Sequence, residues 1–274
     1  MNMNEQLKNK ITELLASNTI KGFLGLRSNE GHIGPHLFTT EAELENLVIG
    51  DFQRPGDSRY PLNKFLINIA GKYPDDTFGV LVRGCDERGL KALFTWNQLN
   101  PNKVVAVGVA CPQELADACE CLKPFPDECV DGQKATACEQ KTVSAIDAMS
   151  VAERFGVWMK EFTKCVKCYG CRDVCPMCFC NECSVGSDDL IHTGHIPPEM
   201  PIFHLTRAVH MIGRCIDCGL CNEACPADIP LRVLYKKGNA LVKDLFDYDT
   251  GSLTTGLSPW KFLGEESGME TKPM

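Results

Sequence analysis

The sequence predicts two domains of different kinds, an α/β domain over residues 1–149 and a helix-rich domain over residues 150–246, followed by an extended tail over residues 247–274. A strand, helix and strand pattern at residues 77–110 predicts the first domain. Two closely spaced groups of cysteines, each preceded by a helical pattern, mark the second. With 274 residues, of which 44% are hydrophobic, the chain is long enough for one or two domains with a buried core.

The α/β domain follows from β-prone runs separated by a helical pattern. A short helix is expected over residues 5–16, whereas residues 22–61 are rich in Gly and Pro without a clean period and predict loops with short strands. Apolar runs at 77–82 and 103–110 flank a helical pattern at 86–99. Elements of these lengths predict a βαβ unit with parallel strands and a right-handed crossover.

The ends of these two strands are candidate ligand positions. Cys85 and Cys111 each follow one strand, so both are expected at the edge where open α/β sheets bind ligands. Residues 84–89 also follow a strand and open a helix, but they lack the G-x-G-x-x-G pattern of dinucleotide sites. We therefore interpret Asp86 as the helix N-cap in preference to part of a phosphate or flavin site.

The second domain begins after a turn-rich linker at residues 112–149. Ser150 and Glu153 form an S-x-x-E capping box, which predicts the start of a helix. Four apolar side chains at helical spacing are expected to form its buried face: Val151, Phe155, Trp158 and Phe162. A second helix is predicted from Pro201, and a third over residues 231–246. The second helix has its own apolar face: Phe203, Leu205, Val209 and Ile212.

The first two of these helices lead into one repeated cysteine motif. Residues 165–176 and 215–226 both read C-x₂-C-x₂-C-x₃-C-P. This is the spacing of two-cluster [4Fe–4S] ferredoxins, in which the fourth cysteine of each motif ligates the other cluster. Crossed ligation assigns one cluster to Cys165, Cys168, Cys171 and Cys225. It assigns the other to Cys175, Cys215, Cys218 and Cys221. A structural zinc site is the alternative for any single C-x₂-C pair.

Six further cysteines have the ligand type for a third metal site, although no complete spacing rule joins them. They are Cys85, Cys111, Cys121, Cys178, Cys180 and Cys183. Tetrahedral thiolate suits both zinc and iron–sulfur centres. The alternative is that several are buried free cysteines, which behave as small hydrophobic side chains.

Charge and motifs exclude several functions. The formal charge of −8, to which each [4Fe–4S] cluster with four thiolates adds about −2, disfavours binding to nucleic acid or anionic membranes. The sequence shows neither an apolar run of about 18 residues nor an apolar export signal at its start, so a cytoplasmic location is expected. No H-E-x-x-H, P-loop or G-x-S-x-G motif occurs, and no catalytic residue is predicted.

Several segments resemble the β-subunit family of coenzyme F420-reducing hydrogenases and formate dehydrogenases. They are Arg83-Gly-Cys-Asp-Glu-Arg-Gly-Leu, Asn97-Gln98, Val107-Gly-Val-Ala-Cys111 and the two cysteine motifs. The resemblance covers residues 77–245 and is most specific at residues 203–218. Within the family, the chain is most similar to the branch in which an α/β domain precedes a two-cluster ferredoxin domain with C-P-x-C-x-C-x₂-C, here residues 175–183.

The resemblance implies an electron-transfer subunit of a larger redox complex. Such subunits pass electrons between a formate dehydrogenase or hydrogenase and a flavoprotein of the heterodisulfide reductase type. Larger relatives bind FAD, so the alternative is a flavin-containing oxidoreductase subunit that reduces F420 or a nicotinamide. The segment Cys119-Glu-Cys121-Leu-Lys-Pro-Phe-Pro replaces the family's C-x₂-C before Pro-x-Pro, which weakens the case for a complete flavin site. A third hypothesis is a scaffold protein with structural zinc.

Overall fold

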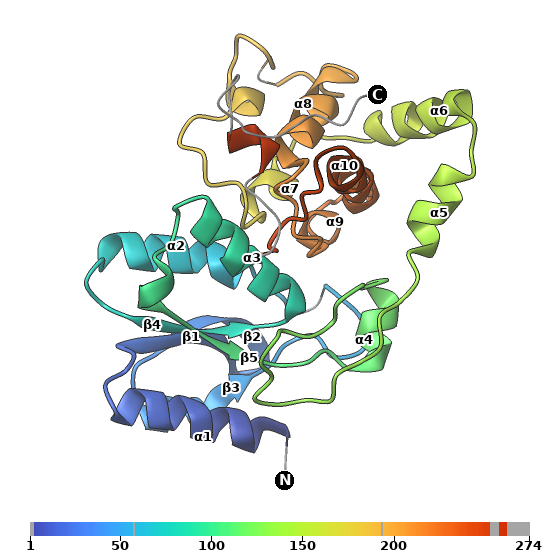
Figure 1. Ribbon diagram of the computed structural model, residues 1–274. Helices are drawn as coiled ribbons and strands as arrows, with labels where there is room; N and C mark the ends of the chain where they lie inside the picture. Colours follow the sequence, from blue (N-terminus) through green and yellow to red (C-terminus); the bar gives the residue numbers. More distant parts are fainter. Residues whose placement is uncertain (1–2, 57, 193, 253–257, 262–274) are drawn as a thin grey trace. The chain divides into compact units, whose positions relative to one another are not determined.

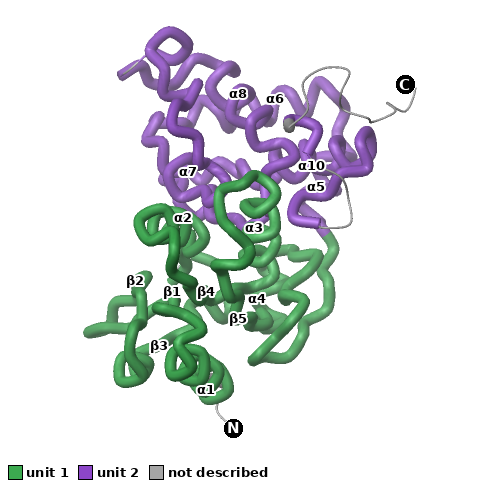
Figure 2. The backbone as a smooth tube through the Cα atoms, turned by 60° about the vertical axis from the view of Figure 1, so that its left-hand side comes forward, with its two compact units in different colours: residues 1–139 green, residues 140–274 purple. Residues whose placement is uncertain are grey.

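The computed structural model describes residues 3–56, 58–192, 194–252 and 258–261 (Figure 1). The chain divides into two compact units, unit 1 over residues 1–139 and unit 2 over residues 140–274 (Figure 2). The predicted domain bounds at residues 149 and 246 stay predictions. In the described part of the chain, no helix is both long and apolar enough to cross a membrane.

Unit 1 is built on a mixed sheet, which confirms the predicted α/β class. The described strands are β1 (Gly22–Asn29), β2 (His32–Phe38), β3 (Leu47–Val48), β4 (Phe78–Val82) and β5 (Val104–Gly108). The strand order is β2-β1-β4-β5, and β3 also pairs with β1. Strands β1 and β2 form an antiparallel hairpin, whereas β1 with β4 and β4 with β5 are parallel. The predicted parallel pairing of the runs at 77–82 and 103–110 is therefore confirmed.

Helices cover both faces of this sheet. The described helices of unit 1 are α1 (Met3–Ala16), α2 (Leu62–Lys72), α3 (Gly84–Thr95) and α4 (Gln113–Ala118), with 3₁₀ turns at Glu41–Asn46 and Pro101–Lys103. Helix α1 lies on one face, and α2 and α3 lie on the other (Figure 1). The predicted first helix is confirmed, and its side chains Leu7, Ile11 and Leu14 are buried.

The prediction of loops with short strands over residues 22–61 is wrong in one respect. Strand β1 has eight residues and pairs with β2, β3 and β4. Its first five residues are all buried, because it lies inside the sheet with neighbours on both sides. A strand buried on both faces shows no alternation of apolar and polar residues, so the period that identifies most strands is missing.

The helix that follows β4 also begins earlier than predicted. Helix α3 starts at Gly84, with Arg83 as its N-cap residue. Asp86 lies three positions further on, and its carboxylate accepts a hydrogen bond of 3.0 Å from the backbone N–H of Arg83. The interpretation of Asp86 as the N-cap residue itself is therefore wrong, although its carboxylate does cap a backbone N–H at this helix end.

Unit 2 consists of helices joined by long loops. The helices are α5 (Lys141–Asp147), α6 (Val151–Phe162), α7 (Gly170–Asp173), α8 (Ile202–Met211), α9 (Leu220–Glu223) and α10 (Leu231–Phe246), with 3₁₀ turns at Ser184–Gly186 and Pro259–Lys261. The capping box at Ser150 and Glu153 is confirmed. The final helix has the predicted bounds.

The predicted buried faces of α6 and α8 are only partly correct. On α6, Phe162 is 1% exposed and stacks on His204, whereas Val151 and Phe155 are 75% and 62% exposed. On α8, Phe203 is buried, whereas Leu205 and Val209 are exposed. Helical spacing shows that apolar residues share a face, but it does not show which turns of that face are covered by another element.

The predicted tail is described at residues 247–252 and 258–261. Tyr248 and Ser258 are buried there, and the indole N–H of Trp260 donates a hydrogen bond of 2.7 Å to the Ile212 carbonyl. These residues therefore pack against other parts of unit 2. The rest of the predicted tail lies outside the described residues.

Candidate metal centres

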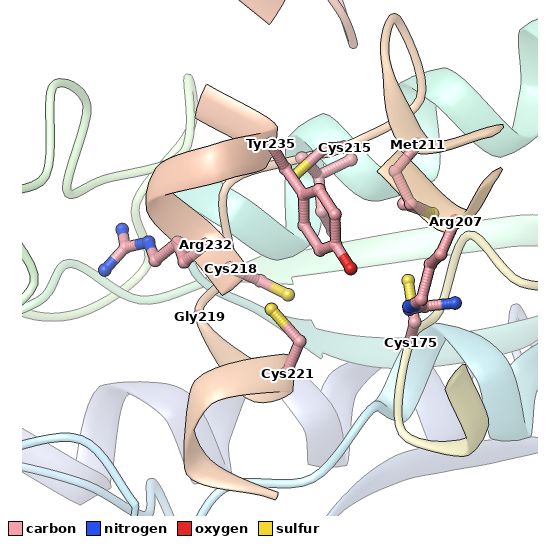
Figure 3. Close-up of a pocket in the computed structure, with 10 residues that line it drawn as sticks. Cys175, Arg207, Met211, Cys215, Cys218, Gly219, Cys221, Arg232 and Tyr235 are labelled. Carbon is pink, nitrogen blue, oxygen red and sulfur yellow. The ribbon is translucent and has the colours of Figure 1, made fainter. Parts of the chain in front are cut away.

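Two cavities in unit 2 are each lined by four cysteines. The first cavity has Cys165, Cys168, Cys171 and Cys225 among its lining residues. The second cavity, shown in Figure 3, has Cys175, Cys215, Cys218 and Cys221. Each set contains three cysteines of one motif and the last cysteine of the other. The structure thus brings together around each cavity the four cysteines that the sequence assigns to one cluster.

The two motifs share the backbone geometry that presents their first cysteine. The backbone N–H of Lys167 donates to the Cys165 sulfur at 3.4 Å, and the backbone N–H of Asp217 donates to the Cys215 sulfur at the same distance. Both donor residues have positive φ, 50° at Lys167 and 55° at Asp217. This turn directs the N–H of the second residue after each cysteine back to its sulfur.

A second left-handed residue precedes the third cysteine of each motif. Tyr169 has φ 60° and Gly219 has φ 85°, and these residues are the N-caps of the short helices α7 and α9. At Gly219, glycine is explained by this conformation. Gly170 is explained by close approach instead, since a Cβ there would lie 2.9 Å from the Ala224 carbonyl oxygen of the other motif.

Burial raises the pKa of several cavity thiols, which favours their protonated form when no cation is bound. Burial raises the pKa of Cys215 to about 12, and it also raises the pKa of Cys221. Hydrogen bonding to Cys178, together with burial, raises the pKa of Cys175. A coordinated metal deprotonates a thiol outright, so these groups suit a positively charged iron centre better than free thiolates. Four thiols around each cavity therefore fit the donor set of a [4Fe–4S] cluster.

Arg207 contacts the first motif and the segment that follows it, and it was not identified from the sequence. Its side chain is 3% exposed and lines the second cavity. One guanidinium nitrogen donates to the Cys171 carbonyl at 2.5 Å, and another to the Cys178 sulfur at 3.3 Å. Its position four residues after Phe203 places it on the buried face of α8.

Two buried polar side chains line the cavities without a hydrogen-bond partner among the described residues. They are Tyr235 at the second cavity, through its hydroxyl, and His204 at the first, through both ring nitrogens. A buried polar group left unpaired costs about 1–3 kcal/mol. Burial, assisted by the Arg207 charge, lowers the pKa of His204 to about 4, so its imidazole is neutral near pH 7. The sequence analysis did not assign either residue to a site.

The six cysteines predicted for a third site are divided between the units. In unit 1, Cys85 and Cys121 are buried, and Arg59 donates to the Cys85 sulfur at 2.9 Å. Burial raises the pKa of Cys85, and it raises that of Cys111 to about 11.

The other three thiols have individual neighbours in unit 2. Cys178 accepts from Arg207, and Cys180 accepts from Arg214 at 3.5 Å. Cys183 packs against the buried cluster of Val185, Ile191 and Phe203. Across the residues that the structure describes, no three His, Cys, Asp or Glu side chains converge on a point where a single metal ion would be held. The third site stays a prediction.

Comparison with known proteins adds a partial relationship. No protein-family profile matches the chain. It is 45% identical over 94 residues to the F420-dependent formate dehydrogenase subunit beta of Methanocaldococcus jannaschii, which is 34% of this chain and 25% of that protein. It is 52% identical over 54 residues to the F420-dependent formate dehydrogenase 1 subunit beta of Methanococcus maripaludis, or 20% of this chain and 14% of that protein.

These matches support a relationship to formate dehydrogenase β subunits over part of their length. The chain spans about a quarter of the first relative and a smaller share of the second. The class that the fold and the matches define is therefore a cysteine-rich mixed α/β chain related in part to these redox subunits. What the whole relatives do belongs to the proposal below.

Proposed function

We propose that this chain is an iron–sulfur electron-transfer subunit that holds two [4Fe–4S] clusters and works within a larger oxidoreductase complex. The observation that carries the proposal is the pair of cavities in unit 2, each lined by three cysteines of one motif and one of the other. This is the ligand distribution that the two-cluster motif requires.

The residues of unit 2 supply what such a relay needs. When bound, each cluster takes up and gives back one electron. The cysteines would hold the cluster in place, and the backbone N–H groups of Lys167 and Asp217 donate hydrogen bonds to the Cys165 and Cys215 sulfurs. Burial of Cys171, Cys175 and Cys221 limits solvent at the centres, and solvent exposure is one of the factors that set their potentials.

The proposed partners follow from the family resemblance and from the names of the relatives. We propose that the chain relays electrons between a formate dehydrogenase or hydrogenase module and a flavoprotein of the heterodisulfide reductase type. Two relatives are named as β subunits of F420-dependent formate dehydrogenases, which supports the formate dehydrogenase side. The word F420-dependent in those names also favours the second candidate function, a flavin-containing subunit that reduces F420 or a nicotinamide.

An anaerobic redox titration of the purified full chain, followed by electron paramagnetic resonance (EPR), tests the proposal. Two separate one-electron transitions, both from iron–sulfur centres, are the expected result. A colourless protein that contains zinc without iron would contradict it. Release of flavin on acid treatment, together with reduction of F420, would replace the relay by the second candidate function.

A further inference from the structure

The two cavities are lined by equivalent cysteines, but each has a different buried side chain whose hydrogen-bonding atoms have no partner among the described residues. At the second cavity the donor is the hydroxyl of Tyr235, which is carried by α10 and is 1% exposed. Figure 3 shows the hydroxyl pointing into the space between Cys175, Cys218 and Cys221. It has no hydrogen-bond partner among the described residues. A buried hydroxyl in such a place has to be explained by what it faces.

At the first cavity the corresponding donor is His204 on α8, which is 2% exposed. Its ring stacks on Phe162 with centroids 4.4 Å apart and planes 17° apart, which fixes its orientation. Neither ring nitrogen is hydrogen-bonded to another described residue. A neutral imidazole has one N–H to donate.

The donors of Tyr235 and His204 would face the sulfur atoms of a bound cluster and its cysteines. In a [4Fe–4S] cluster, the bridging sulfides and the cysteine sulfurs accept hydrogen bonds. Reduction adds negative charge to the cluster, so a hydrogen bond is stronger in the reduced state and raises the reduction potential. Arg207 lies near both donors, 5.8 Å from the Tyr235 ring centre, but it also contacts the Cys171 carbonyl and so acts on both centres.

We propose that Tyr235 and His204 are the hydrogen-bond donors that set the two cluster potentials individually, Tyr235 for the cluster of the second cavity and His204 for that of the first. The inference rests on the proposed function, since it requires the clusters. An electron that passes between them oxidises one cluster and reduces the other, and no proton leaves either side chain. The two potentials then determine which cluster holds the electron.

The test is an EPR-monitored potential titration of the full chain, of two variants and of one control variant. Tyr235→Phe removes one oxygen and keeps the ring, so the potential of the second-cavity cluster should shift negatively while the other stays constant. His204→Phe should shift the first-cavity cluster alone. Tyr248→Phe, at a buried tyrosine outside both sets of lining residues, is the matched control and should shift neither.

One further variant is expected to shift the potential in the opposite direction. It distinguishes a lost hydrogen bond from damage to the cluster in the Phe variants. A 3-fluorotyrosine at position 235 has a more acidic hydroxyl, donates a stronger hydrogen bond and should shift the potential positively. Unchanged potentials in all variants, with about eight iron atoms retained per chain, would overturn this inference and leave the relay intact. Equal shifts of both clusters would also overturn it. Iron missing from the wild-type chain would overturn the proposed function instead.

Discussion

The two cysteine motifs share a backbone but differ in charge. At the second residue after the first cysteine, one motif has Lys167 and the other has Asp217. The buried Lys167 ammonium donates to Glu199 and to the His192 carbonyl. Asp217 instead pairs with Arg232 at 2.6 Å and Lys236 at 3.4 Å. Both keep the same N–H bond to sulfur. Cysteine spacing and positive φ therefore define the motif, while the side chains are free to set its electrostatics.

The residue with positive φ that precedes the third cysteine also differs between the two motifs, although its backbone conformation is the same. Gly219 adopts φ 85° without steric cost, whereas Tyr169 adopts φ 60° with a full side chain. Two contacts of the tyrosine ring offset that cost. It packs edge-on against Phe203 at 5.6 Å, and the Arg172 guanidinium lies 4.5 Å above it. Unlike Gly219, Tyr169 therefore holds its motif against a neighbouring helix.

The largest expected effect comes from removing the cysteine that each motif gives to the other. Cys175→Ser and Cys225→Ser should each lower the iron content from about eight to about four atoms per chain. With crossed ligation, Cys175→Ser and Cys215→Ser leave the same EPR signal, because both residues line the second cavity. Cys165→Ser leaves the other signal.

Cys129→Ser, in unit 1, is the control and should retain both signals. If Cys175→Ser and Cys165→Ser left the same signal, each motif would ligate its own cluster and the crossed assignment would be wrong.

A smaller effect is expected at Arg207, the side chain that anchors the first motif to α8. Arg207→Leu removes two charged hydrogen bonds and leaves the Cys171 carbonyl without its donor, at a cost of roughly 2–4 kcal/mol. Hydrogen exchange in unit 2 should show that loss of local stability around Cys171 and Cys178. Arg154→Leu, on the more exposed helix α6, should change protection by less than about 0.5 kcal/mol. Similar exchange in both variants would show that the hydrogen bonds of Arg207 do not stabilise the first motif.

The next largest effect on local stability is expected at Gly219, the left-handed residue of the second motif. Gly219→Ala places a Cβ at φ 85° and is expected to cost about 1–2 kcal/mol in local stability of the second motif. Gly219→Asn should cost less, since asparagine tolerates this conformation. Hydrogen exchange of residues 215–226 measures both. Equal losses for Ala and Asn would mean that contact with neighbours, and not φ, explains the glycine.

The smallest effect concerns the helices that lead into the motifs. Helix α6 has a capped start, where the Ser150 side chain accepts from the Glu153 backbone N–H, whereas α8 starts after Pro201 without a side-chain cap. Ser150→Ala should cost about 1 kcal/mol and increase hydrogen exchange in the first turn of α6 alone. Unchanged exchange there would show that the cap does not stabilise this helix.

Local patterns in the sequence predicted much of the fold. The parallel pair β4 and β5, the capping box at Ser150 and the bounds of α10 depend on short-range rules of spacing and propensity. The buried strand β1 was not predicted at its full length, because its burial depends on the strands that pair with it. The exposure of the first turns of α6 was not predicted for a related reason. Helical spacing does not show which turns of a helix another element covers.

The candidate site divides in the same way. Its cysteines were grouped by a spacing rule, and the structure places each predicted set around one cavity. Arg207, Tyr235 and His204 carry no motif, and only the packing of α8 and α10 brings them to the cavities. The third-site cysteines were grouped by residue type alone, and the chain divides them between two units.

Analysis of iron, acid-labile sulfide and zinc in the wild-type chain, purified without oxygen, tests the two-cluster assignment most directly. Two [4Fe–4S] clusters predict about eight iron and about eight sulfide per chain, with a brown colour that fades on reduction. About four iron per chain, or zinc in place of iron, would contradict the assignment of both cysteine-lined cavities to clusters.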